Sequence, residues 1–143
     1  MNRPMVSLMS VIVLVISLVI MGCGSPDDKK VDFVKKGKAL FEQKDYTRAK
    51  LEFKNAAQID PEYAEAYYML GQVALEERDF PNAYKLFKKT VSLDPEHLDA
   101  RINLGRILIG AREPLKAEEQ IEYILAKDPE NIPAQLLKAS VFL

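Results

Sequence analysis

A three-residue sequence, Asp-Pro-Glu, recurs along this chain at a fixed interval of 34 residues. Glycines and alanines elsewhere in the chain keep the same interval. The Asp-Pro-Glu sequences begin at Asp60, Asp94 and Asp128. The glycines are Gly37, Gly71 and Gly105, and the alanines are Ala49, Ala83 and Ala117. An interval that is kept through successive units predicts a stack of similar structural units, each packed mainly on its neighbours.

Each unit shows two helical segments. Apolar residues fall at a spacing of about 3.6 residues in both segments, and a short polar turn separates them. Pro81 and Pro114 follow these turns at positions where the first turn of a helix tolerates a residue without an amide hydrogen. We expect the Asp of each Asp-Pro-Glu to cap the next unit's first helix and the Pro to begin that helix.

The three units resemble the tetratricopeptide repeat, whose pattern is W-x2-L-G-x2-Y…A-x3-F…P. Repeat one spans residues 30–63, repeat two 64–97 and repeat three 98–131; the departures from the pattern include Lys36, Arg101 and Ile124. Residues 132–143 are either the first helix of an incomplete fourth repeat, which we favour, or a capping helix. The resemblance implies an all-α solenoid of antiparallel helix pairs, about three and a half repeats long, after an N-terminal apolar signal helix.

The amino terminus is directed to a membrane. Residues 5–21 form an uncharged, mostly apolar run, whose length suits either a signal peptide or a short membrane anchor. The run ends in Ile20-Met21-Gly22-Cys23, which resembles the lipobox of bacterial lipoproteins. That resemblance implies a signal peptide over residues 1–22, a lipidated Cys23 and a short linker over residues 23–29. An uncleaved signal anchor is the alternative.

Composition excludes several classes of function. The chain carries 20 Lys and Arg against 21 Asp and Glu, so it lacks the basic excess typical of nucleic-acid binding. A single His and a single Cys leave no set of residues for a zinc site or a nucleophilic triad. The sequence therefore predicts a protein without catalytic residues, metal or cofactor, and it predicts that His97 is a surface residue.

The resemblance also predicts where partners bind. In this family the first helices of the repeats line a concave face that holds peptides, and equivalent positions on that face follow from the period. The predicted groove consists of an apolar row (Val34, Tyr68, Ile102 and Leu136) and a polar row (Lys38, Gln72, Arg106 and Ser140). The carboxylate clamp that holds chaperone tails in some members is absent, because the five clamp positions hold Val34, Lys38, Met69, Asp99 and Asn103.

Together these features predict a lipid-anchored scaffold or adaptor of the bacterial cell envelope that binds other proteins or peptides. The chain is similar in architecture to the tetratricopeptide lipoproteins of exosortase (PEP-CTERM) systems, and more loosely to those of pilus and outer-membrane protein assembly. Gly24 after the Cys favours the outer membrane, facing the periplasm. The alternative reading is a signal-anchored inner-membrane subunit of an envelope complex.

Overall fold

The computed structural model describes residues 26–141, which form seven α-helices and no strand. In chain order these are α2 (Pro26–Glu42), α3 (Tyr46–Ile59), α4 (Ala64–Glu76), α5 (Phe80–Leu93), α6 (Leu98–Gly110), α7 (Pro114–Lys127) and α8 (Ile132–Val141). The apolar run, Cys23 and the proposed cleavage site lie outside the described residues. The first turn of α2 falls in the segment expected to be the linker.

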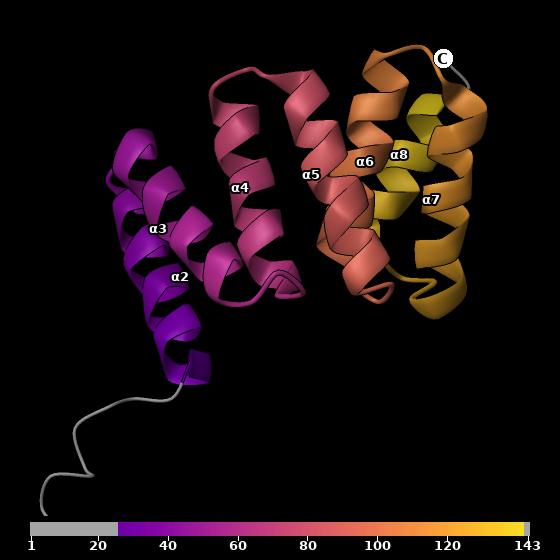
Figure 1. The fold of residues 1–143 in the computed structure, drawn as a ribbon. Helices are drawn as coiled ribbons and strands as arrows, with labels where there is room; N and C mark the ends of the chain where they lie inside the picture. Colours follow the sequence, from indigo (N-terminus) through magenta and orange to yellow (C-terminus); the bar gives the residue numbers. More distant parts are fainter. Residues whose placement is uncertain (1–25, 142–143) are drawn as a thin grey trace, which may run out of the picture.

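The helices pair in sequence and the pairs stack into an array, with α2 and α3 at one end and α6, α7 and α8 at the other (Figure 1). The closest packing is within the pairs α2–α3, α4–α5 and α6–α7, and α8 packs on both α6 and α7. The solenoid of about three and a half repeats that the sequence predicted is therefore confirmed.

Small residues let the two helices of a pair approach closely. Phe53 and Phe87 are fully buried, and each ring lies against a glycine of the preceding helix, Gly37 and Gly71 respectively. In the third repeat the equivalent large residue is Ile121, which leaves more room beside Gly105. The glycine interval seen in the sequence therefore corresponds to one packing contact, repeated with a variation in the third unit.

The turn inside each repeat has the same backbone form. Its central residue, Lys44, Arg78 or Arg112, has a positive φ of about 60°. In the first turn, the N–H of Asp45 donates to the carbonyl of Leu40 and that of Lys44 donates to Phe41, which is the Schellman pattern of helix ends. Asp45 then caps α3 by accepting the N–H of Arg48 at 3.1 Å.

The expectation that the Asp and Pro of each Asp-Pro-Glu begin the next helix was wrong, although the Asp does end the helix before it. Asp60 and Asp94 are the C-caps of α3 and α5, and the next helices begin only at Ala64 and Leu98. Each Asp side chain accepts the N–H of the residue two positions later, at 2.9 and 3.0 Å. The residue before a proline is driven to extended backbone, so the Asp ends one helix and the proline occupies the turn rather than the next helix.

Candidate protein-binding surface

The structure separates the predicted apolar row into buried and accessible members. Val34 and Ile102 are only 4% and 6% exposed and belong to the core between helices. Tyr68 is partly exposed, and Leu136 on α8 is 67% exposed. Because Val34 and Ile102 offer almost no surface, Tyr68 and Leu136 are the members of this row that can touch a partner.

The polar row is brought together in part, in a cluster that joins the first helices of three repeats. Lys38 Nζ on α2 lies 2.6 Å from Glu65 Oε1 in the first turn of α4. The other oxygen of Glu65 lies 3.7 Å from His97 Nε2, at the start of α6. The His97 ring stacks on Tyr68 with centroids 4.4 Å apart, and the side chain of Gln72 donates to the Tyr68 hydroxyl at 2.5 Å.

His97 is the position where the expectation of a surface residue was wrong. Its side chain is only 14% exposed, and its Nδ1 accepts the N–H of Ala100 at 3.2 Å, capping α6. In the neutral ring this leaves the proton on Nε2, directed toward Glu65. A sequence that lacks a second metal ligand gave no signal of this role, because the partners Glu65 and Tyr68 come from α4, far from His97 along the chain.

The charges in this cluster shift one another's protonation. Contact with Glu65 raises the pKa of His97 above its ordinary value, against the opposing effect of burial. The pKa of the Glu65 carboxyl is lowered, first by His97 and also by Lys38. The hydroxyl of Tyr68 has a raised pKa because it is partly buried. We call Lys38, Glu65, Tyr68, Gln72 and His97 the polar cluster.

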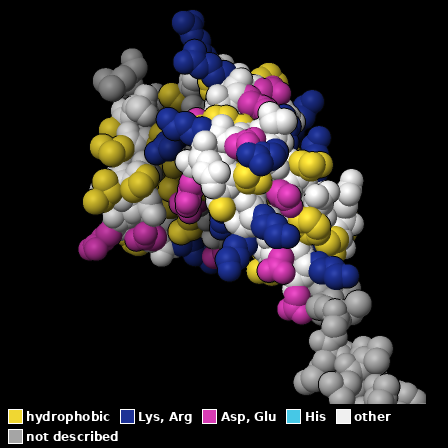
Figure 2. Space-filling model, turned by 90° about the vertical axis from the view of Figure 1, so that its left-hand side faces the viewer, with side chains coloured by type: hydrophobic (Ala, Val, Ile, Leu, Met, Phe, Trp, Pro, Cys, Tyr) yellow, Lys and Arg dark blue, Asp and Glu magenta, His cyan; other side chains and the backbone are white. Residues whose placement is uncertain are grey.

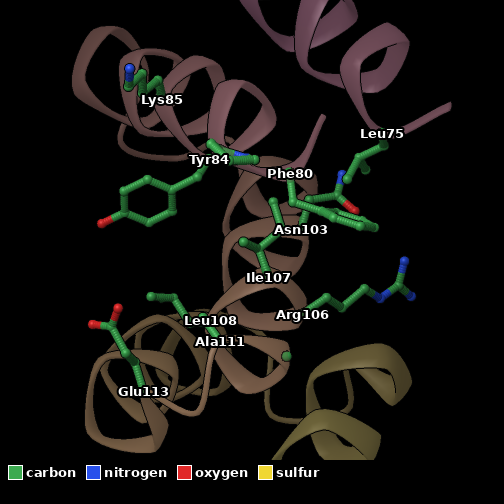
Figure 3. Close-up of a pocket in the computed structure, with 12 residues that line it drawn as sticks. Leu75, Phe80, Tyr84, Lys85, Asn103, Arg106, Ile107, Leu108, Ala111 and Glu113 are labelled. Carbon is green, nitrogen blue, oxygen red and sulfur yellow. The ribbon is translucent and has the colours of Figure 1, made fainter. Parts of the chain in front are cut away.

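Arg106, the third member of the polar row, lies apart from this cluster and borders a pocket of about 720 Å³ (Figure 3). Side chains of Phe80 and Tyr84 from α5 lie across the pocket from Leu108 and Ala111 at the end of α6, with Ile107 between them. Sequence reasoning missed this pocket. Comparing equivalent positions between repeats was the signal that could have found it.

The outer surface carries charges of both signs. Viewed from the α2–α3 end, Lys and Arg side chains alternate with Asp and Glu side chains and with scattered apolar ones (Figure 2). Several pairs connect successive repeats, including Lys50 with Glu77 at 2.6 Å and Lys127 with Glu96 at 3.2 Å, and Lys30 pairs with Asp60 within the first repeat at 2.7 Å. Hydrogen bonds to Asp27 and Asp60 raise the pKa of Lys30.

Neither a membrane span nor a metal-binding cluster is found in the part of the chain that the structure describes. None of the helices within residues 26–141 has both the length and the apolar character needed to cross a bilayer. No group of three or more His, Cys, Asp or Glu side chains in the same residues is arranged to hold a metal ion. The described surface is that of a helical-repeat solenoid with a polar cluster and an apolar pocket.

Comparison with known families agrees with this class. A model described as "Tetratricopeptide repeat" matches residues 74–141, and one described as "TPR repeat" matches residues 37–77. The chain is a tetratricopeptide repeat (TPR) protein. No curated protein sequence matches it.

Solved structures share the fold at low sequence identity. The second TPR domain of human RPAP3, in complex with the HSP70 peptide SGPTIEEVD, is 18% identical with a TM-score of 0.76, over 83% of this chain and 99% of that one. YrrB, described as a TPR protein with an unusual peptide-binding site, is 21% identical with a TM-score of 0.68, over 73% of this chain and 54% of that one. A mutant O-GlcNAc transferase of Thermobaculum terrenum is 19% identical with a TM-score of 0.72, over 83% of this chain and 23% of that one.

Proposed function

We propose that this protein is a lipid-anchored scaffold that binds other proteins at the surface of a bacterial envelope membrane, without catalysis of its own. The TPR fold supports a protein-interaction role. The sequence feature that carries the envelope assignment is Ile20-Met21-Gly22-Cys23, which ends the apolar run directly before the repeat array. Acylation of Cys23 and of the new amino terminus would hold the protein in the bilayer, since each buried CH₂ contributes about 0.8 kcal/mol.

The position at which α2 begins supports a short link between the proposed lipid anchor at Cys23 and the repeat array. Only Gly24 and Ser25 lie between Cys23 and Pro26, where α2 begins. A lipid on Cys23 would therefore keep the first repeat beside the headgroups. Lys29 and Lys36 are exposed in this first helix, and cations there favour an anionic lipid surface.

The partner is proposed to be a protein or peptide rather than nucleic acid or a small substrate. The accessible members of the first-helix surface include Lys38, Tyr68, Gln72, Arg106 and Leu136, which combine polar groups with an apolar one. We do not propose that this chain binds the chaperone peptide found in complex with the RPAP3 domain. Of the five clamp positions, Val34, Met69 and Asn103 are buried here, and Asp99 would repel a carboxylate.

Metabolic labelling with a fatty-acid precursor tests the anchor. The full chain should take up label and fractionate with outer membranes, and Cys23→Ala should do neither; Cys23→Ser is the matched variant that keeps the residue's size. The mature protein should also begin at Cys23 by mass. Labelling of Cys23→Ala, or an intact unlabelled amino terminus in the inner membrane, would favour the signal-anchored subunit instead.

The finer assignment concerns the system that the scaffold serves. We propose an exopolysaccharide or exosortase type system, since its lipoproteins also pass from a lipobox to repeats through a very short linker. Crosslinking in cells, followed by identification of the proteins joined to residues of the first helices, tests this. Recovery of pilus or outer-membrane assembly components in their place would contradict it.

A further inference from the structure

Two side-chain tethers close the junction between repeats one and two. Tyr46 on α3 donates its hydroxyl proton to Glu76 at the end of α4, at 2.9 Å. One turn further along α3, Lys50 donates to Glu77 at 2.6 Å. The ring of Phe41 packs against that of Tyr46, with centroids 5.3 Å apart and planes tilted by 60°, so an aromatic pair accompanies the first tether.

The next junction, between repeats two and three, has lost both tethers. Adding the 34-residue interval replaces the pair Tyr46–Glu76 with Phe80 and Gly110, and the pair Lys50–Glu77 with Tyr84 and Ala111. These four replacements all line the 720 Å³ pocket. Phenylalanine has no hydroxyl to donate, and neither Gly110 nor Ala111 has a side-chain acceptor, so neither tether can form between these side chains of α5 and the end of α6.

The first helices are farther apart at this junction than at its neighbours. Within residues 26–141, α2 packs on α4 and α6 packs on α8, whereas α4 and α6 make at most a slight contact; α5 still packs on α6 about as closely as α3 packs on α4. Phe80 remains 53% exposed at the pocket, where its equivalent Tyr46 is partly buried. An exposed aromatic side chain beside an apolar hollow is typical of a site that receives another apolar group.

Charge around the pocket favours an anionic partner. Arg106 and Lys85 border it on opposite sides (Figure 3), and both are exposed. Among the described residues neither forms an ion pair. The one acidic side chain of the lining, Glu113, is already paired with Lys116. The pocket is therefore mostly apolar inside, with Asn103 as a polar side chain of its lining, and has two available cations at its edges.

We propose that the junction pocket of repeats two and three binds an acidic segment of a partner protein, inserting one bulky apolar side chain between Phe80 and Ile107. Carboxylates flanking that side chain pair with Lys85 and Arg106. The pocket's volume falls within the range of sites that hold a large side chain or small ligand. The inference rests on the proposed role in protein binding, but it places the contact outside the polar cluster and needs no membrane anchor.

The test compares short fluorescent peptides by anisotropy, using the full chain in lipid nanodiscs. One peptide carries a phenylalanine between glutamates, a second has alanine in place of the phenylalanine, and a third has lysines in place of the glutamates. The first should bind about tenfold or more tightly than either of the others. Its affinity should fall as salt is raised, because the two cations are exposed.

Variants that restore the tethers supply the decisive comparison. Phe80→Tyr with Gly110→Glu rebuilds the first tether, and Tyr84→Lys with Ala111→Glu rebuilds the second; together they should reduce peptide affinity at least about tenfold. Thermal unfolding checks that they fold. Lys85→Gln and Arg106→Gln, which leave the pocket open, should each weaken binding about threefold to tenfold. Lys88→Gln, at an exposed lysine of α5 outside the pocket lining, is the matched control and should leave affinity unchanged.

Three results would overturn the proposal. The first is unchanged affinity in the open-pocket charge variants. The second is a peptide whose amide chemical-shift changes map to the polar cluster rather than to α5 and the end of α6. The third is a dimer, seen by sedimentation, that the tether variants dissociate, since a second copy would then occupy the pocket. None of these depends on Cys23 labelling, so failure here is distinct from failure of the envelope assignment.

Discussion

The ring of Phe53 occupies the space that a side chain on Gly37 would need. A Cβ at residue 37 would lie 2.4 Å from Cε1 of Phe53, and one at Gly71 would lie 2.7 Å from Cε1 of Phe87. Both rings are fully buried, so they have little room to move. In the third repeat, a Cβ at Gly105 would meet only Leu137 at 3.5 Å and Ile121 at 3.8 Å, which are ordinary contacts.

Replacing the equivalent glycines with alanine should therefore change the stability of the protein in opposite directions. Gly37→Ala and Gly71→Ala should each lower the free energy of unfolding by about 1–2 kcal/mol, since overpacking exceeds the gain in helix propensity. Gly105→Ala should raise it by about 0.5–1 kcal/mol, because only the propensity gain remains. Urea unfolding followed by circular dichroism measures all three; a destabilised Gly105→Ala would contradict the packing described here.

Non-glycine residues hold the left-handed position in all three turns between paired helices. Replacing Lys44, at φ 61°, with glycine should stabilise the protein by about 0.5–1 kcal/mol, because glycine accepts this backbone without steric cost. Arg78→Gly should behave alike. Lys54→Gly, in the middle of α3 and also exposed, is the control and should cost about 1 kcal/mol. Equal losses from Lys44→Gly and Lys54→Gly would argue against the positive φ.

The array could be predicted from the sequence because its determinants are local and repeated. The Gly–Phe contact and the turn at Lys44 each depend on residues within one unit, and the 34-residue interval displays them together. The start of α4 could not be placed correctly. Asp60 looks like a helix N-cap by residue type, and only its accepted bond from Glu62 shows that it belongs to the turn.

The candidate site was less predictable because it depends on contacts between repeats. His97 seemed an isolated surface residue, yet Glu65 and Tyr68 of α4 lie against it. Val34 seemed a groove residue, yet neighbouring helices bury it. The amino-acid types alone do not show how closely two repeats approach each other. For the same reason they do not show that a pocket lies where the tethers are missing, at Phe80 and Tyr84.

Arg101 stands where the family pattern has tryptophan, and it makes three contacts that an apolar residue would not. Its Nε donates to the carbonyl of Pro95 at 2.9 Å, its Nη1 donates to Gln120 at 2.8 Å, and its guanidinium lies 3.5 Å from the centre of the Tyr123 ring. Arg101→Ala should lower the free energy of unfolding by about 2–3 kcal/mol, since the side chain is only 9% exposed and its partners would lose their bonds.

Gln135 provides the matched control for Arg101. It occupies the equivalent position on α8 and likewise donates to a proline carbonyl, that of Pro129, at 2.8 Å, but it is exposed. Gln135→Ala should therefore cost only about 0.5–1 kcal/mol. Similar losses for the two variants would mean that the contacts of Arg101 with Gln120 and Tyr123 contribute little.

Glu65 should control the titration of His97, the sole histidine of the chain. Contact with Glu65 raises the pKa of His97, so the protonated ring stabilises the folded state fully below its ordinary value of 6.5 and loses that effect as pH rises through the folded pKa. Glu65→Gln should lower the His97 pKa, measured from the single Cε1 proton resonance by NMR. Glu62→Gln removes the same charge from an exposed neighbour and should leave that pKa nearly unchanged.

The next repeat supplies a variant that separates titration from capping. Asn131 stands 34 residues after His97 and caps α8 through its Oδ1, which accepts the N–H of Ala134 at 3.1 Å. His97→Asn should therefore keep the cap on α6 and remove the titrating ring, so that stability no longer falls as pH rises above 6.5. Protonation of the wild-type ring also forfeits the Nδ1 cap, which opposes Glu65. If the wild-type protein were instead to gain stability over that rise in pH, the cap would outweigh the ion pair, and Glu65 would not be the dominant partner.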